Sequence, residues 1–276
     1  MMPWYEWILL PLVGAAGGFL AGMLGVGGGI IFIPLLTWLF SRFGLAPEEV
    51  VRFTLANSIF LVVVSGLVGT LRQYRQQAWQ WQKVLRIGIP GAVASFLLTK
   101  LIQYGDWYSK PRFQSVFLVF LLLAVANMLF GKKTADEQEE NAPNPMLEGF
   151  VGIIAGMVVA LSGLGGGVVM VPLFRMLLKM PMRLATGLSL SIIPLLGLAP
   201  LLGYLLPKEA PHLPVWQSGY IAWPYAIPMA VGVAVFATLG LKAAKHVSET
   251  TLRLIFASLS GVVILKTLYD IIFHHG

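Results

Sequence analysis

The sequence predicts an all-α polytopic membrane protein built from two inverted repeats, each a glycine-broken, re-entrant helical hairpin plus three transmembrane helices. Three observations lead to this fold class: a strongly apolar composition, several uninterrupted apolar stretches of about 20 residues, and a glycine cluster that occurs twice. Of the 276 residues, 57% are hydrophobic and 11% are charged, against roughly 25% charged residues in a soluble domain. This composition excludes a soluble enzyme, a nucleic-acid binder and a disordered chain.

The charge of the chain fits the same class. Nineteen Lys and Arg against twelve Asp and Glu give a formal net charge of +7. The basic residues lie between apolar runs, so we interpret them by the rule that they gather on the cytoplasmic side of a membrane protein. The absence of Cys excludes disulfides, thiolate zinc sites and cysteine nucleophiles. Because residues 1–6 contain no Lys or Arg, we expect the first apolar segment to stay in the protein rather than act as a cleaved signal peptide.

Six apolar stretches are long enough to cross a bilayer as unbroken helices, which need about 20 apolar residues. They are Val50–Leu71, Val84–Ile102, Phe113–Phe130, Leu184–Leu206, Ile221–Leu241 and Leu252–Phe273. Two further segments, Trp7–Phe40 and Leu147–Leu178, would each be roughly 50 Å long as straight helices, which exceeds the hydrocarbon core of about 30 Å. Each contains three consecutive glycines, which break helices readily. We therefore predict that each segment forms two shorter helices joined at a glycine turn.

The chain divides into two similar halves. Residues 131–147 are rich in Lys, Asp, Glu and Pro, which predicts a charged cytoplasmic linker between an N-terminal repeat, 1–130, and a C-terminal repeat, 148–276. A glycine pattern with a following proline recurs at a constant offset of 138: Gly14, Gly18, Gly25, Gly27, Gly28, Gly29 and Pro34 match Gly152, Gly156, Gly163, Gly165, Gly166, Gly167 and Pro172. A second block recurs at an offset of 131: Arg52, Ser58 and Gly66 match Arg183, Ser189 and Gly197. We interpret this as an internal duplication.

The distribution of basic residues predicts the orientation of the repeats. If each glycine-broken segment enters and returns on the same side, twelve basic residues are cytoplasmic and seven are external. If each crossed the membrane once instead, the basic clusters at 72–86 and 242–253 would fall on opposite sides, so the positive-inside rule favours the first arrangement without excluding the second. In the first arrangement each half has three full spans plus one re-entrant hairpin, and an odd number of spans places the halves in opposite orientations. The cytoplasmic set is Arg72, Arg75, Lys83, Arg86, Lys132, Lys133, Arg175, Lys179, Arg183, Lys242, Lys245 and Arg253, and the external set is Arg42, Arg52, Lys100, Lys110, Arg112, Lys208 and Lys266.

The glycine turns are the candidate substrate site. A helix that restarts after each turn has free N–H groups and the positive end of its dipole at the turn, and glycine lets a ligand approach these amides closely. Two such helix starts facing each other near the midplane would bind an anion without a charged side chain. The candidate residues are Gly27, Gly28, Gly29, Gly165, Gly166 and Gly167, with Ser162, Asn57, Ser58, Thr186 and Ser189 nearby in the sequence pattern.

Several glycines, hydroxyl residues and charged residues also have an interpretation that involves no ligand. Gly14, Gly18, Gly22, Gly152 and Gly156 have the small-residue spacing of helix packing, and we favour that role for them. Ser58, Thr186 and Ser189 could equally bond to backbone across helices. Among charged residues, Lys266 and Asp270 are spaced to pair with each other. Arg52 and Arg183 could attract an anion, although we favour snorkelling to the interface.

Two segments resemble the signature of the sulfite exporter TauE/SafE family. They are GMLGVGGGIIFIPLL at residues 22–36 and its second copy, GLGGGVVMVPL at residues 163–173. RLATGLSL at residues 183–190 is similar to the segment that follows in the family, whereas the first copy departs from the pattern with TLANS at residues 54–58. The resemblance implies a multi-pass permease of the bacterial inner membrane for small sulfur-containing anions, such as sulfite or sulfoacetate, with uptake of related organosulfur compounds also occurring in the family.

From these observations we expect a secondary transporter, not an enzyme, that works by alternating access. A passive anion channel and the uptake of another small anion remain alternatives. No nucleophile–base pair and no His/Cys/Asp cluster supports a membrane-embedded enzyme or an assembly subunit. We expect no cofactor and no metal, no nucleic-acid partner, and a lipid bilayer around the chain. Proton or sodium coupling and a homo-oligomer are left open.

Overall fold

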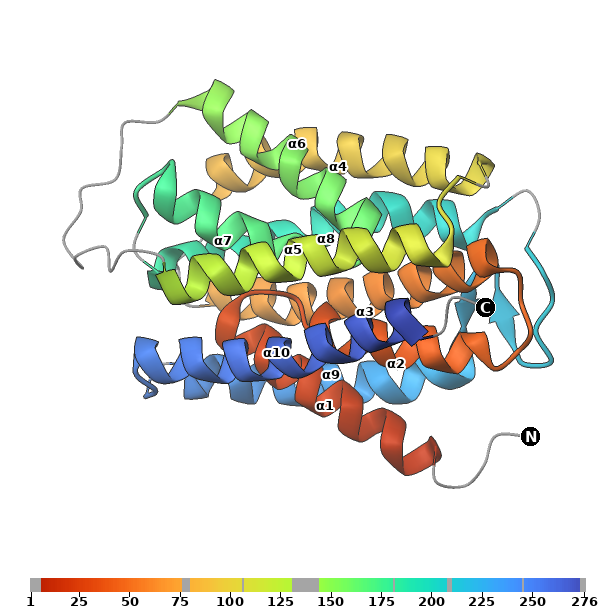
Figure 1. Cartoon of the computed structure of the whole chain (residues 1–276). Helices are drawn as coiled ribbons and strands as arrows, with labels where there is room; N and C mark the ends of the chain where they lie inside the picture. Colours follow the sequence, from red (N-terminus) through yellow and green to blue (C-terminus); the bar gives the residue numbers. More distant parts are fainter. Residues whose placement is uncertain are drawn as a thin grey trace.

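The computed structural model describes residues 6–75, 80–105, 107–130, 144–180, 182–207, 210–244 and 246–273. Within these ranges the chain forms ten α-helices and one short β-hairpin (Figure 1). The helices before the linker are α1 (Glu6–Leu24), α2 (Gly29–Ser41), α3 (Pro47–Arg75), α4 (Trp81–Tyr104) and α5 (Lys110–Phe130). Those after it are α6 (Pro145–Ser162), α7 (Gly167–Met176), α8 (Met182–Leu205), α9 (Trp223–Ala243) and α10 (Glu249–Phe273), and the strands are β1 (Gln217–Ser218) and β2 (Ile221–Ala222).

The predicted helix breaks are confirmed. The first long apolar segment is divided into α1 and α2, and the second into α6 and α7, with the glycine clusters between them. Each of the six uninterrupted stretches lies in one long helix, with two corrections. Leu206 lies just beyond the end of α8. The stretch from Ile221 starts in β2, which pairs antiparallel with β1, and α9 begins only at Trp223. Of the predicted linker, residues 131–143 lie outside the described residues, as do Lys208 and Lys245.

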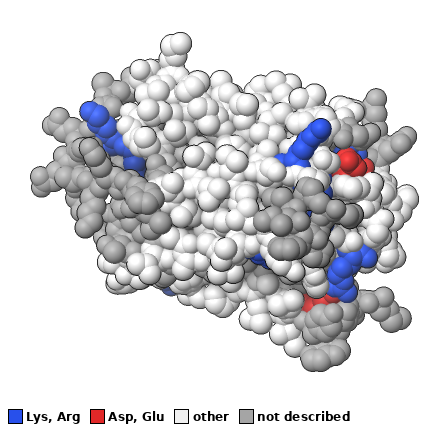
Figure 2. Space-filling view, in the orientation of Figure 1, with Lys and Arg blue, Asp and Glu red and all other residues white. Residues whose placement is uncertain are grey.

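The outer surface is that of a multi-pass membrane protein. Six helices in the described part of the chain, α1, α3, α4, α6, α8 and α9, are long and apolar enough to cross a membrane by length and composition. On the face that Figure 2 shows, most Lys, Arg, Asp and Glu side chains lie towards the two ends of the molecule, and the broad region between them is almost free of charge. An apolar region of this kind suits the hydrocarbon interior of a bilayer.

Two seams of closely packed helices hold the molecule together, and each joins one half of the chain to the other. In the first seam α1 lies along α9, and in the second α6 lies along α4. The glycines of both seams face backbone of the partner helix: a Cβ built on Gly18 would lie 2.6 Å from Val233 Cα, and one on Gly152 or Gly156 would overlap the carbonyl of Ile87 or Gly91. The packing interpretation is confirmed for the glycines to which it was applied, namely Gly14, Gly18, Gly22, Gly152 and Gly156.

Polar contacts at the two ends of the molecule show where the helices begin and end. Arg42 directly follows α2, and its Nη1 lies 2.7 Å from Oε1 of Glu6, the first residue of α1. The hairpin formed by α1 and α2 therefore returns to the end from which it starts. At the opposite end, Arg72 near the end of α3 donates to the carbonyl of Thr238 in α9. In Figure 1, α3, α4, α5, α8, α9 and α10 each run the length of the molecule between these ends.

We expect Gly18→Ala to lower the stability of the protein. The new methyl group would press on the α9 backbone at Val233, which cannot move aside as a flexible side chain could. Overpacking of this kind costs about 1–3 kcal/mol, and a thermal unfolding curve in detergent would show a lower Tm. Gly261→Ala in α10 is the matched control, because nothing lies within 4 Å of its added Cβ. Equal Tm values for the two variants would contradict the proposed seam.

Candidate anion site at the glycine turns

Each glycine turn is a short left-handed interruption between two helices. The first turn has positive φ at Gly25 (71°), Gly27 (89°) and Gly28 (80°). The second repeats this at the equivalent positions with nearly the same angles: 66° at Gly163, 89° at Gly165 and 72° at Gly166. Residues with a Cβ rarely adopt this conformation, so the glycines are required by the backbone before any ligand is considered.

The two turns lie against each other in the interior. A Cβ built on Gly29 would lie 2.7 Å from the Gly163 carbonyl oxygen, and one on Gly167 would overlap the Gly25 carbonyl. The Val62 side chain, near the middle of α3, lies beside both turns. The predicted meeting of the turns is therefore present. In this conformation the two backbones touch directly.

Two serines hold the turns in place through a reciprocal pair of hydrogen bonds. Ser58 Oγ on α3 donates to the Gly163 carbonyl, and Ser189 Oγ on α8 donates to the Gly25 carbonyl, both at 2.9 Å. Ser58 and Ser189 are equivalent in the duplication, as are Gly25 and Gly163. Each half of the chain therefore uses its serine to hold the turn of the other half. Both side chains are fully buried.

The restarted helices have no side-chain caps at the turns. Gly28 is the N-cap of α2 and Gly166 is the N-cap of α7, and neither position receives a side-chain capping hydrogen bond. Uncapped first-turn N–H groups carry the positive end of the helix dipole. The arrangement therefore places two partly positive backbone surfaces in the buried centre of the molecule.

The other predicted site residues divide into two groups. Ser162 and Thr186 lie at the turns: Ser162 Oγ donates to the Val158 carbonyl and accepts from the Leu164 N–H, and the Thr186 backbone is 2.8 Å from a Cβ built on Gly25. Asn57 has a different environment. Its amide group donates to the carbonyls of Phe53 and Tyr220, and its oxygen accepts from the Ala222 N–H, so it anchors the β-hairpin to α3.

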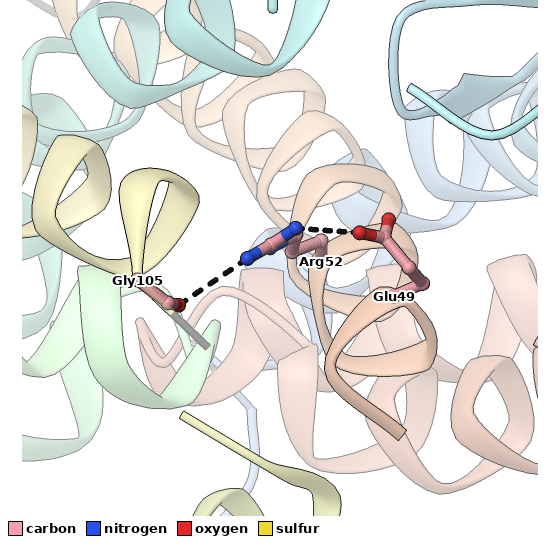
Figure 3. Close-up of polar contacts among 3 residues, drawn as sticks. All are labelled: Glu49, Arg52 and Gly105. Atoms are coloured by element: carbon pink, nitrogen blue, oxygen red, sulfur yellow. Dashed lines mark hydrogen bonds and ion pairs between the residues drawn. The ribbon is translucent and has the colours of Figure 1, made fainter. Parts of the chain in front are cut away.

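A buried ion pair near the β-hairpin was not predicted from the sequence. Arg52 Nη1 lies 2.5 Å from Glu49 Oε1, and Arg52 Nη2 donates at 3.2 Å to the Gly105 carbonyl just after α4 (Figure 3). The side chain points into the protein and the residue is only 8% exposed, so the expected snorkelling to the interface is wrong. The pairing of Arg52 with Glu49 could have been predicted, because the two residues are three positions apart on one helix.

The same ion pair sets the environment of Tyr220 in the turn of the β-hairpin. Burial raises the pKa of the Tyr220 phenol to about 12, the Glu49 carboxylate also raises it, and the Arg52 guanidinium opposes the rise. The phenol is therefore protonated at neutral pH. The side chain of Arg183, the equivalent of Arg52, lies outside the described residues, as does that of Asp270.

A polytopic helical protein whose two broken helices meet in its interior has the architecture of a membrane transporter. The family model described as sulfite exporter TauE/SafE matches residues 10–267. A probable membrane transporter protein of Methanocaldococcus jannaschii is 30% identical over 261 residues, which cover 93% of this chain and 94% of that protein. A probable membrane transporter protein of Haemophilus influenzae is 28% identical, with 91% and 93% covered, and the probable membrane transporter protein YunE of Bacillus subtilis is 22% identical, with 97% and 99% covered.

The chain belongs to the sulfite exporter TauE/SafE family. This is a family of transporters and not of enzymes, and its description implies a small anion as substrate. The match extends over both glycine turns and all ten helices except the outermost residues of α1 and α10.

We expect Arg52→Gln to destabilise the protein by about 3 kcal/mol, because it leaves the largely buried Glu49 carboxylate without its cation. Adding Glu49→Gln should restore part of the loss, since the double variant contains no unpaired charge. Unfolding free energies of the wild type, the two single variants and the double variant form the cycle that measures this coupling. Simple additivity of the two single effects would show that the pair has no energetic role.

Proposed function

We propose that this chain is a secondary transporter that moves small sulfur-containing anions, such as sulfite, sulfoacetate or related organosulfonates, across the bacterial inner membrane by alternating access. The observation that carries the proposal is the meeting of two uncapped helix starts in the buried centre, in a chain that belongs to the sulfite exporter TauE/SafE family. Backbone N–H groups at helix starts bind anions without requiring a fixed positive charge. Such a site can bind and release its substrate without the strong affinity of a buried ion pair.

The substrate is bound in this proposal between Gly27–Gly29 and Gly165–Gly167, with the hydroxyls of Ser58 and Ser189 as further donors. The turns touch in the present conformation, so they separate when an anion enters. Separation breaks the bonds from Ser58 to Gly163 and from Ser189 to Gly25. The two hydroxyls released from these carbonyls then donate to the anion oxygens. Ser162 and Thr186 complete the site, while Asn57 maintains the β-hairpin beside it.

The contacts between the halves support a particular division into moving parts. Because α1 packs along α9 and α6 along α4, neither 1–130 nor 148–276 moves as a unit. We infer that one moving part is built on the α1–α9 seam and the other on the α4–α6 seam. The opposite directions of α1 and α6 in Figure 1 support the inverted arrangement of the two repeats. Relative movement of the seams opens the glycine turns to one side of the membrane at a time.

The test is anion flux into sealed proteoliposomes that contain the purified protein. Sulfite, sulfate, thiosulfate, sulfoacetate and taurine are compared, each with and without a proton or sodium gradient. A carrier gives saturable uptake of at least one sulfur oxyanion, with accumulation driven by a gradient. Conductance that rises linearly with concentration would instead indicate the passive channel. Movement of none of the five compounds would contradict the proposed substrate class.

Removal of either serine hydroxyl is expected to weaken substrate binding. Ser58→Ala and Ser189→Ala should each raise the KM for the transported anion about tenfold, because a charge-assisted hydrogen bond is lost. Ser95→Ala is the matched control: Ser95 is buried and donates to the Leu196 carbonyl on another helix, not to a carbonyl of either turn. All three variants should lose about 1 kcal/mol of stability. An unchanged KM in the first two variants would assign Ser58 and Ser189 to scaffolding alone.

A further inference from the structure

A cavity lined by apolar and basic side chains lies at the end of the molecule where α2 finishes. It has a volume of about 700 Å³ and lies between α2, the start of α3, the start of α5 and the last part of α10. Its lining includes Pro34, in the second turn of α2, and the side chains of Lys110 and Lys266. The glycine-turn residues and the serines that hold the turns are not among the residues that line it.

The cavity is positively charged. No carboxylate of a described side chain is within ion-pair distance of Lys110 or Lys266. Lys110 Nζ donates at 3.2 Å to Ser41 Oγ, which itself donates to the Thr37 carbonyl, so this ammonium is held at the cavity wall by neutral groups. Glu6 and Glu49 are paired with Arg42 and Arg52, and Glu48, which follows Pro47 of the cavity wall, forms no ion pair with either lysine. Among the described side chains, neither lysine is therefore neutralised by a carboxylate.

One nearly buried polar side chain in the wall has no hydrogen-bond partner among the described residues: Thr37 is 7% exposed and its Oγ1 is unpartnered. The carboxamide side chain of Gln114, which is 9% exposed, also lines the cavity. A buried polar group without a partner is unfavourable, and such groups in natural proteins normally meet water or a ligand. The start of α5 at Lys110 adds the positive end of a helix dipole to the same cavity, whereas the start of α3 at Pro47 carries Glu48 and Glu49 in its first turn.

We propose that this cavity is a second, peripheral anion site that binds a tetrahedral or pyramidal oxyanion between Lys110 and Lys266, with Thr37 and Gln114 as neutral hydrogen-bonding partners. An oxyanion matches the site because its oxygens accept hydrogen bonds from ammonium, hydroxyl and amide donors at the same time. The chemistry is shared by a free sulfur or phosphorus oxyanion and by the phosphate of an acidic lipid. The proposal is independent of transport at the glycine turns.

The rim of the cavity is compatible with either source. Trp38 lines it and is 46% exposed, and the Arg42 guanidinium lies 4.9 Å from the centre of the Trp38 ring. An indole beside basic groups is typical of the membrane–water boundary. A lipid phosphate reaches such a rim from the bilayer, whereas a free anion reaches it from the aqueous side.

The experiment measures thermal stabilisation of the full chain, delipidated in a non-ionic detergent at constant ionic strength. Sodium sulfate is titrated in one arm, with chloride as the balancing anion. Phosphatidylglycerol is titrated in the other, with phosphatidylcholine for comparison. Saturable stabilisation by sulfate that the cavity variants weaken identifies a free-anion site in the cavity. Stabilisation by phosphatidylglycerol but not by sulfate or phosphatidylcholine identifies a lipid-phosphate site.

The variants assign the effect to the cavity. Lys110→Gln combined with Lys266→Gln should weaken the apparent affinity for the effective probe about tenfold or more, and Thr37→Val should weaken it several-fold. Lys100→Gln combined with Lys242→Gln removes the same net charge from residues outside the cavity and should leave the affinity within about twofold. Two results would overturn the proposal: no saturable stabilisation by either probe, or equal weakening in the two double variants. Neither readout depends on transport, so failure here leaves the proposed function standing.

Discussion

Direct contact between backbones is the constraint on which the rest of this structure depends. Within a bilayer, every peptide group has to be satisfied inside the protein, and non-helical backbone is tolerated only where it is enclosed. The two glycine turns meet this requirement by enclosing each other, with Ser58 and Ser189 bonded to carbonyls that the turns leave without helical partners. The same absence of side chains lets α1 approach α9 and α6 approach α4 at backbone distance.

The buried charged residues meet the same requirement, because each is paired inside the protein. Glu6 and Glu148, which are almost fully buried, each lie within ion-pair distance of an arginine at an end of the molecule, at 2.7 Å from Arg42 and 3.6 Å from Arg86. Arg52 is paired with Glu49 in a similar position. The central region is left to backbone dipoles and hydroxyl groups. An uncharged centre between charged ends suits a protein that has to release its anion as well as bind it.

The sequence predicted those features that depend on local residues. Consecutive glycines placed the helix breaks, because the positive φ values they adopt are unfavourable for other residues, and the spacing of Gly14, Gly18 and Gly22 indicated a packed face. The sequence could not identify which helix packs on the glycine face of α1, because small residues allow any helix to approach closely. The choice of α9, in the other half of the chain, is a property of the tertiary structure.

The contacts of polar residues were harder to predict, because their partners are also set by the tertiary structure. Asn57 was expected beside the glycine turns, but its partners Tyr220 and Ala222 are more than 160 positions away in the sequence. The β-hairpin itself was missed because Ile221 and Ala222 continue the apolar run of α9. Arg52 points inward because the Gly105 carbonyl, at the C-terminal end of α4, accepts its hydrogen bond. No local sequence pattern reveals this contact. The anion site itself remains a prediction.

The exchange of helices between the halves has a consequence for biogenesis. Translation delivers α1 to the membrane long before α9 has been synthesised, so the glycine face of α1 has no native partner during that interval. The N-terminal half therefore cannot complete its packing as an independent unit. Until residues 223–243 enter the bilayer, that face has to be covered by something other than α9. Assembly of the native protein is thus a late event that requires nearly the whole chain.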